Sequence, residues 1–274
     1  MPDKRTAFFI SDRPGITVEM LGHSLLTQFD GVEFKQVTIP FVDTVEKAAE
    51  VANHINQVGL AEGSCPLVFS TLVNPEISSI IAAANALFMD FFQVFTDPLE
   101  NELGVKSSHT VGRSHSFSTS YSYQSRIEAV NYALNHDDGV STRDLNQADV
   151  ILVGVSRCGK TPTCLYMALL FGIRAANYPL VLEDFSSMTL PAQLKPLRQK
   201  LYGLTINPER LQHIRNERKP GSSYATLTNC QFEIKEAEAL MRQEGIHYID
   251  TTTKSIEEIA TTILHQANLE RHIY

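Results

Sequence analysis

The sequence predicts an α/β protein with two parallel sheets. Three observations lead to this fold class. Apolar strands alternate with amphipathic helices in the N-terminal part of the chain, a serine-rich stretch interrupts this pattern, and a second series of strands and helices follows. Such alternation is typical of doubly wound sheets whose strands run parallel.

The N-terminal series follows from hydrophobic periodicity. In chain order we expect a strand over residues 7–12, a helix over 16–29, a strand over 32–39, a helix that begins at Asp43, a strand over 66–72 and a helix over 76–88. Asp43 and Glu46 have the spacing of a capping box. These elements predict a Rossmann-like α/β domain over residues 1–105.

Residues 106–125 are rich in serine and lack apolar periodicity. We therefore expect a linker or mobile loop here. Three basic side chains in it, His109, Arg113 and His115, either contact phosphate or belong to a solvated loop.

The second series, within residues 126–274, begins with a helix that we place at 124–135. It continues with a strand over 150–155, a helix over 162–172, a strand over 178–182, a helix that begins at Asn207, a strand over 247–249 and a helix that begins at Ser255. The first strand is a continuous apolar run, which favours a buried parallel strand.

Between that strand and its helix lies Gly154-x-x-x-x-Gly159-Lys160-Thr161, which fits the Walker A pattern. The glycines allow backbone to approach phosphate, Lys160 reaches the terminal phosphates, and Thr161 is the candidate ligand of Mg²⁺. The predicted nucleotide-binding residues are Gly154, Val155, Ser156, Arg157, Cys158, Gly159, Lys160 and Thr161. This phosphate loop makes the second unit a P-loop, kinase-like α/β domain.

Acidic groups near the loop have two interpretations each. Asp137 and Asp138 either stabilise a turn or position a hydroxyl or a metal. Asp184, after the strand predicted at 178–182, either lies near Mg²⁺ as a Walker B acid or caps the next helix. The basic helix after Asn207, which carries Arg215, is a lid over phosphates, a contact for an acidic partner, or a solvated face.

Composition narrows the function classes. The net charge of −8 and the pI near 5.6 argue against general binding to nucleic acid or to membrane surfaces. The four cysteines form no C-x-x-C pair, which argues against a disulfide scaffold or structural zinc. The apolar run at residues 7–10 is too short for a signal peptide or a membrane span. We therefore expect a cytoplasmic protein, and a homodimer.

A GTPase would have an N-K-x-D motif after the loop, and the sequence has none. A motor or transporter ATPase would have longer signature elements and a dedicated hydrophobic Walker B strand, which we do not find, so phosphotransfer is the default. The segments GVSRCGKTPT at 154–163, GIRAANYP at 172–179, YGLTINPERL at 202–211 and HDDGVSTRDLNQA at 136–148 are similar to those of bacterial phosphoenolpyruvate synthetase regulatory proteins, which are relatives of the plant pyruvate, phosphate dikinase regulatory proteins. The resemblance covers essentially the whole chain.

The resemblance implies a bifunctional enzyme. Such proteins are serine/threonine kinases that use ADP to phosphorylate a threonine of the partner synthetase, which inactivates it. They also use inorganic phosphate as co-substrate to remove the mark, with release of pyrophosphate. The cysteine-containing loop and the segment RAANYP favour the synthetase over the dikinase as partner. At positions 13 and 14, Arg and Pro stand where the family has a glycine and a threonine.

On this basis Lys160 and the loop hold the ADP phosphates, and Ser156 and Arg157 face the transferred group. A general base is required for the threonine hydroxyl. Asp149 and Asp184 are the candidates, with Asp137 behind them. An ATP-dependent small-metabolite kinase and a nucleotide sensor without catalytic activity remain the alternatives.

Overall fold

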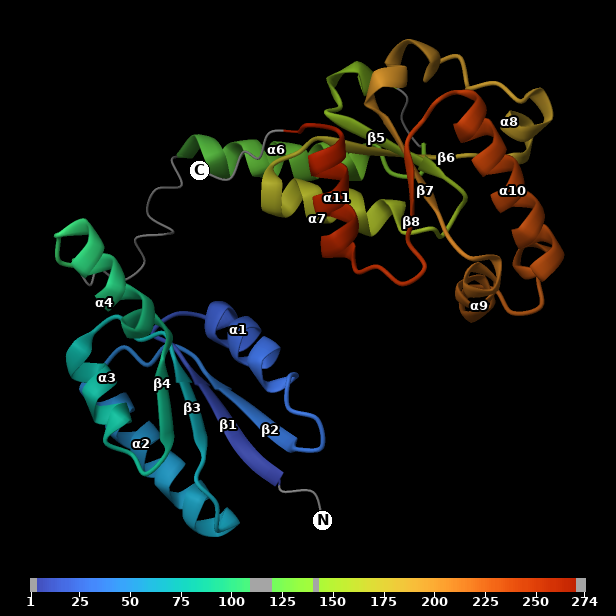
Figure 1. Cartoon of the computed structure of the whole chain (residues 1–274). Coiled ribbons are helices and arrows are strands. Elements are labelled where there is room, and N and C mark those ends of the chain that lie inside the picture. The colour runs from blue at the N-terminus through green and yellow to red at the C-terminus, as the bar shows by residue number, and fades with distance from the viewer. Residues whose placement is uncertain (1–3, 109–119, 140–142, 270–274) are drawn as a thin grey trace. The chain divides into compact units, whose positions relative to one another are not determined.

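The computed structural model describes residues 4–108, 120–139 and 143–269, and the chain forms two compact units, residues 1–116 and 117–274 (Figure 1). Each unit contains one four-stranded parallel sheet, so the predicted α/β class is confirmed. His109, Arg113 and His115 lie outside the described residues.

The first sheet has the strand order β2-β1-β3-β4. Its strands are β1 (Lys4–Ile10), β2 (Glu33–Ile39), β3 (Leu67–Ser70) and β4 (Leu87–Asp90). Its helices are α1 (Ile16–Leu26), α2 (Val45–Glu62), α3 (Pro75–Ala82) and α4 (Phe91–Leu103). Helix α3 is therefore shorter than the predicted helix over 76–88, and its last predicted residues belong to β4.

Alternation along β1 gives this sheet two apolar faces. Ala7 and Phe9 pack with α1 on one face, whereas Phe8 and Ile10 pack with α2 and α3 on the other. Figure 1 shows α1 and the pair α2 and α3 on opposite sides of the strands. The unit is doubly wound, as the periodicity predicts.

The second sheet repeats the plan with the order β6-β5-β7-β8. Its strands are β5 (Val150–Gly154), β6 (Ala175–Pro179), β7 (Leu201–Thr205) and β8 (Tyr248–Asp250). Its helices are α6 (Ser120–Asn135), α7 (Lys160–Phe171), α8 (Leu182–Ser187), α9 (Pro208–Arg218), α10 (Leu227–Gln243) and α11 (Ile256–Gln266), with 3₁₀ turns η1 (Leu145–Gln147), η2 (Lys195–Lys200) and η3 (Ser223–Ala225).

Three expectations for this unit need correction. Helix α6 begins at Ser120 rather than at the predicted residue 124, so residues 120–123 are helical and not part of a linker. The strand predicted over 178–182 lies at Ala175–Pro179, because the small alanines there are the residues that the sheet buries. Strand β7 and helix α10 were not predicted.

The centre of this unit is β5, which is buried along its whole length between β6 and β7. Helix α7 packs against α6 and α11 on one face, and α10 packs against β7 on the other. In each unit the helix that follows the first strand starts in the same way. Gly15 precedes α1 with φ 87° and ψ 5°, and Gly159 precedes α7 with φ 96° and ψ 8°.

Candidate active site at the carboxyl edge of the second sheet

The phosphate loop leaves β5 at Gly154, which has φ 150°. A Cβ atom at this position would lie 2.2 Å from the carbonyl oxygen of Leu204 on the neighbouring strand β7. A side chain there would force two paired strands apart. The close approach of β7 therefore explains the first glycine of the motif.

At its other end the loop turns into α7 through Gly159. A Cβ atom at Gly159 would meet no atom within 4 Å apart from those of the two adjoining residues, so that side of the turn is open. Glycine has no side chain with which to cap the helix, and the first N–H groups of α7 remain available. Such a helix start attracts anions because its free N–H groups and the helix dipole both present positive charge.

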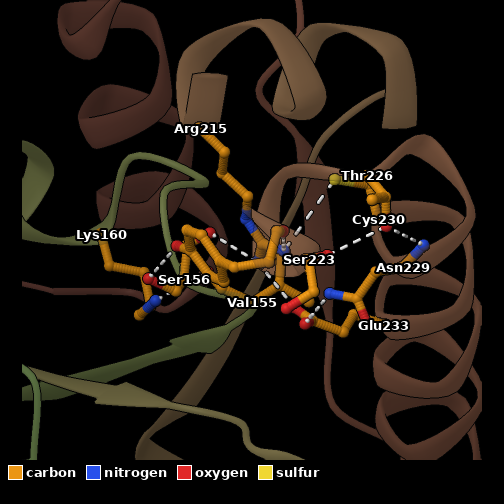
Figure 2. A network of polar contacts seen from close by, with 10 residues as sticks. Val155, Ser156, Lys160, Arg215, Ser223, Thr226, Asn229, Cys230 and Glu233 are labelled. Carbon is orange, nitrogen blue, oxygen red and sulfur yellow. Dashed lines mark hydrogen bonds and ion pairs between the residues drawn. The ribbon is translucent and has the colours of Figure 1, made fainter. Parts of the chain in front are cut away.

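Lys160, the first residue of α7, is only 3% exposed. Its Nζ donates a 2.9 Å hydrogen bond to the carbonyl oxygen of Val155 within the same loop (Figure 2). The ammonium group is thus held inside the loop, which is the position from which a lysine contacts bound phosphates.

Thr161 meets the turn that follows α6. Its hydroxyl donates to Oδ1 of Asp137 over 2.7 Å. Asn177, which is buried in β6, donates from Nδ2 to the same Oδ1 at 2.6 Å and to the Thr161 hydroxyl at 2.9 Å. Asp138 accepts a longer bond of 3.3 Å from that amide. The structure therefore brings Asp137 to the phosphate loop.

These groups suit Mg²⁺, which takes oxygen ligands and usually keeps several waters or phosphate oxygens. Thr161 is the residue that would hold it, with Asp138 beside it. Asn177 Oδ1 is buried without a hydrogen-bond partner, which leaves one more oxygen beside the cluster. Within the described residues no group of three His, Cys, Asp or Glu side chains forms a complete protein cage for a metal.

Asp149 does not join this site. It precedes β5, whereas the loop follows it, and five residues of strand at about 3.3 Å each separate the two ends by roughly 16 Å. Its Oδ2 accepts a 2.7 Å bond from the N–H of Arg174, and its Oδ1 lies 3.8 Å from the guanidinium of Arg174. As a general base Asp149 is therefore badly placed.

Asp184 lies in α8, not at the end of a strand. Its Oδ2 accepts a 2.9 Å hydrogen bond from the N–H of Val181, which is how a side chain in the first turn caps a helix. Burial raises the pKa of its carboxyl above the ordinary value. Of its two predicted roles, the geometry agrees with the helix cap.

Ser156 is held by residues far along the chain. Its Oγ accepts a 2.9 Å bond from the Tyr224 hydroxyl, and its carbonyl accepts a 3.1 Å bond from Nη2 of Arg215. Figure 2 shows Arg215 directed from α9 toward the loop. Arg215 is completely buried, so this member of the predicted basic helix is neither a lid residue nor part of a solvated face.

A pocket of about 230 Å³ lies beside Ser156. Its lining consists of Ser156, Pro179, Leu180, Val181, Leu182, Glu183, Tyr224 and Glu233. Tyr224 and Glu233 were not predicted as site residues because nothing near them in the sequence marks them. Asn177 could have been found, since it lies in the segment GIRAANYP that supports the family resemblance.

Cys158 faces inward from the loop and is 1% exposed. Burial raises the pKa of its thiol, although the nearby Lys160 opposes this effect. Its carbonyl accepts a 3.1 Å bond from the Thr251 hydroxyl. Cys158 therefore contributes packing and a backbone contact, while its thiol stays protonated.

The fold and the site together define an α/β protein with a Walker A-type loop between a buried parallel strand and a helix. More specifically, residues 7–264 match the family model described as kinase/pyrophosphorylase, and the chain belongs to that family. In the described residues no helix is both long and apolar enough to cross a membrane.

Relatives with high identity span nearly the whole chain. One from Laribacter hongkongensis is 57% identical over 272 residues, which is 99% of each chain. Relatives from Aromatoleum aromaticum and Bordetella parapertussis are 56% and 53% identical and cover 98% of each chain. All three are named phosphoenolpyruvate synthase regulatory protein, and the name is provisional in each case.

Proposed function

We propose that this protein is a bifunctional regulator of phosphoenolpyruvate synthase. In one direction it transfers a phosphoryl group from ADP to a threonine of that enzyme and inactivates it. In the other, inorganic phosphate removes the mark, pyrophosphate is released, and the enzyme becomes active again. The family description and the names of the relatives support a phosphotransferase that acts on this partner.

The single observation that carries the proposal is the contact between the phosphate loop and Asp137. Lys160 and the loop N–H groups bind the ADP phosphates, and Arg157 adds a second cation at the loop. Mg²⁺, held at Thr161, supplies neutralisation of phosphate charge when it is bound. A carboxylate within reach of the same phosphoryl group is then suited to accept a proton.

We assign the general base to Asp137. The hydrogen bonds from Thr161 and Asn177 both end on Oδ1 of Asp137. Oδ2 is therefore the oxygen that takes the proton of the acceptor threonine. The threonine oxygen forms a bond to the β-phosphorus of ADP, the bond from that phosphorus to the bridging oxygen breaks, and AMP leaves. In the reverse activity an oxygen of inorganic phosphate attacks the phosphothreonine phosphorus, and the threonine oxygen recovers the proton.

The test is to incubate the purified protein with phosphoenolpyruvate synthase and either ADP or ATP, and to locate phosphothreonine by mass spectrometry. We expect the mark with ADP, and its loss with release of pyrophosphate when phosphate is added. Lys160→Ala should abolish both reactions, whereas Lys195→Ala, an exposed lysine outside the loop, should leave both intact.

Other outcomes identify the alternatives. Transfer to a small molecule with ATP would indicate a metabolite kinase, and transfer to pyruvate, phosphate dikinase alone would change the partner. Nucleotide-dependent binding without a covalent mark would indicate a sensor. The proposed homodimer is checked separately by light scattering of the purified protein.

A further inference from the structure

Arg215 is a buried cation next to the phosphate loop. Its side chain is fully buried, and its Nη2 contacts Oε2 of Glu233 at 2.6 Å. A buried charge is stable only when a partner and further hydrogen bonds replace its lost hydration. Arg215 has both, because Nη1 also donates to the carbonyl of Tyr224 at 3.0 Å.

The guanidinium group also lies over an aromatic ring. Its Cζ is 3.9 Å from the ring centroid of Tyr224, a distance typical of a cation–π contact. Glu233 is fixed in turn, since its Oε1 accepts a 2.7 Å bond from Asn229 (Figure 2). Arg215, Tyr224 and Glu233 thus form one connected unit, here termed the Ser156 clamp.

The clamp holds both oxygens of Ser156. Arg215 binds the carbonyl, and the Tyr224 hydroxyl donates to Oγ. A hydroxyl that accepts a hydrogen bond can still donate its own hydrogen. In the part of the chain that the structure describes, no group accepts the hydrogen of Ser156 Oγ. That hydrogen is therefore available to a ligand.

We propose that Arg215 and Tyr224 are positioning residues that direct the Ser156 hydroxyl at an oxygen of the phosphoryl group being transferred. This inference rests on the proposed function of the loop. A donor that is already fixed before the reaction stabilises developing negative charge without the cost of reorientation. The hydrogen bond from Arg215 to the Ser156 carbonyl contributes as well, because it holds the loop backbone in place and so maintains the direction of the Ser156 hydroxyl.

A double-mutant cycle tests the role of Tyr224. Tyr224→Phe removes only the phenolic oxygen and retains the ring beneath Arg215, and Ser156→Ala removes the hydroxyl itself. We expect Ser156→Ala to lower kcat for threonine phosphorylation by about 10²-fold, the usual contribution of one preorganised donor, and Tyr224→Phe to lower kcat less, while KM for ADP changes less than about twofold. If Tyr224 acts through Ser156, the double variant is no slower than Ser156→Ala alone.

Two results would overturn the inference. One is a wild-type rate for Tyr224→Phe, and the other is a double variant whose loss is the product of the two single losses. The melting temperature of each variant is measured alongside. A merely structural role of Tyr224 would lower the melting temperature and would not make the two losses in kcat non-additive.

Arg215→Lys examines the other half of the clamp. Lysine keeps the charge but cannot bind Ser156, Glu233 and Tyr224 at once. We expect kcat to fall about tenfold, with Arg218→Lys, an exposed position on the same helix, at the wild-type rate. Equal effects at the two positions would contradict the assignment.

Failure of the proposed function would be recognised separately. If the wild-type protein transfers no phosphoryl group from ADP, the proposed function fails whatever the variants do, and the same cycle is measured on the rate of phosphoryl transfer from ATP. Non-additive losses for Tyr224→Phe and Ser156→Ala would then still support the clamp, and additive losses or none would overturn it.

Discussion

The hydroxyl of Thr161 donates a 2.7 Å hydrogen bond to Oδ1 of Asp137, across 24 residues of sequence. The bond joins the first turn of α7 to the turn after α6. Of the three acids considered as general base, Asp137 is therefore the one that contacts the phosphate loop.

Asp137→Asn should therefore abolish most of the transfer. The amide keeps an oxygen for Thr161 but cannot accept a proton from the threonine substrate. We expect the initial rate of phosphothreonine formation to fall by about 10² to 10⁴, the usual contribution of general base catalysis. ADP affinity, measured by calorimetry, should change little. Asp144→Asn, an exposed acid in the same connection, serves as the control.

The two glycines of the loop should differ in what they contribute. Gly154→Ala places a methyl group 2.2 Å from the Leu204 carbonyl oxygen, and we expect the free energy of unfolding to fall by about 3 kcal/mol or more. Gly159→Ala meets open space but keeps a positive φ, and should lower it by roughly 1 to 2 kcal/mol. Urea unfolding followed by circular dichroism distinguishes them, and equal losses would contradict the geometry.

Asp184 predicts a pH dependence of stability. Burial raises the pKa of its carboxyl in the folded protein above the ordinary 3.8, so folding favours the protonated form. The wild-type protein therefore loses stability through this group as the pH rises from 3.8 through the folded pKa. Asp184→Asn is neutral throughout and avoids that loss.

The free energy of unfolding of Asp184→Asn minus that of the wild type should thus increase with pH across this window and then level off. Urea titrations at a series of pH values measure the difference directly. A difference that decreases with rising pH would show that the carboxylate is stabilised in the fold.

The cysteines should differ in reactivity. Cys65 is exposed, whereas Cys158, Cys164 and Cys230 are buried. Because alkylation requires the thiolate and burial raises the pKa of the Cys158 thiol, iodoacetamide at neutral pH should label Cys65 in the native protein. The other three should react only after denaturation, as peptide mass spectrometry would record. Rapid labelling of Cys158 would mean that the loop opens readily.

The sequence could predict elements that leave a strong local signal. The continuous apolar run at 150–155 contains β5, and Gly154 and Gly159 mark where β5 and α7 meet the loop. Weak local signals failed. Strand β7 was missed because it includes Gly203, and glycine weakens the signal of a strand. The structure explains this glycine, since a Cβ there would lie 2.3 Å from the sulfur of Met241.

The site was predictable only in part for the same reason. The Walker A spacing lies within eight consecutive residues and locates the loop. The partners of the loop come from elsewhere: Asp137 precedes it, and Tyr224 is 68 residues beyond Ser156. Such pairings depend on strand order and helix packing, which no local pattern contains. Asp149 shows why, since it is close to the loop in sequence but precedes β5, whereas the loop follows that strand.

The glycine turns before α1 and α7 have almost the same backbone angles, within sheets of the same strand order. The next residue is Ile16 in the first turn and Lys160 in the second. The same glycine conformation is thus followed by an apolar side chain in one unit and by a cationic side chain in the other. An anion whose binding required the ammonium group would therefore discriminate between the two turns, although their glycines have nearly the same backbone angles.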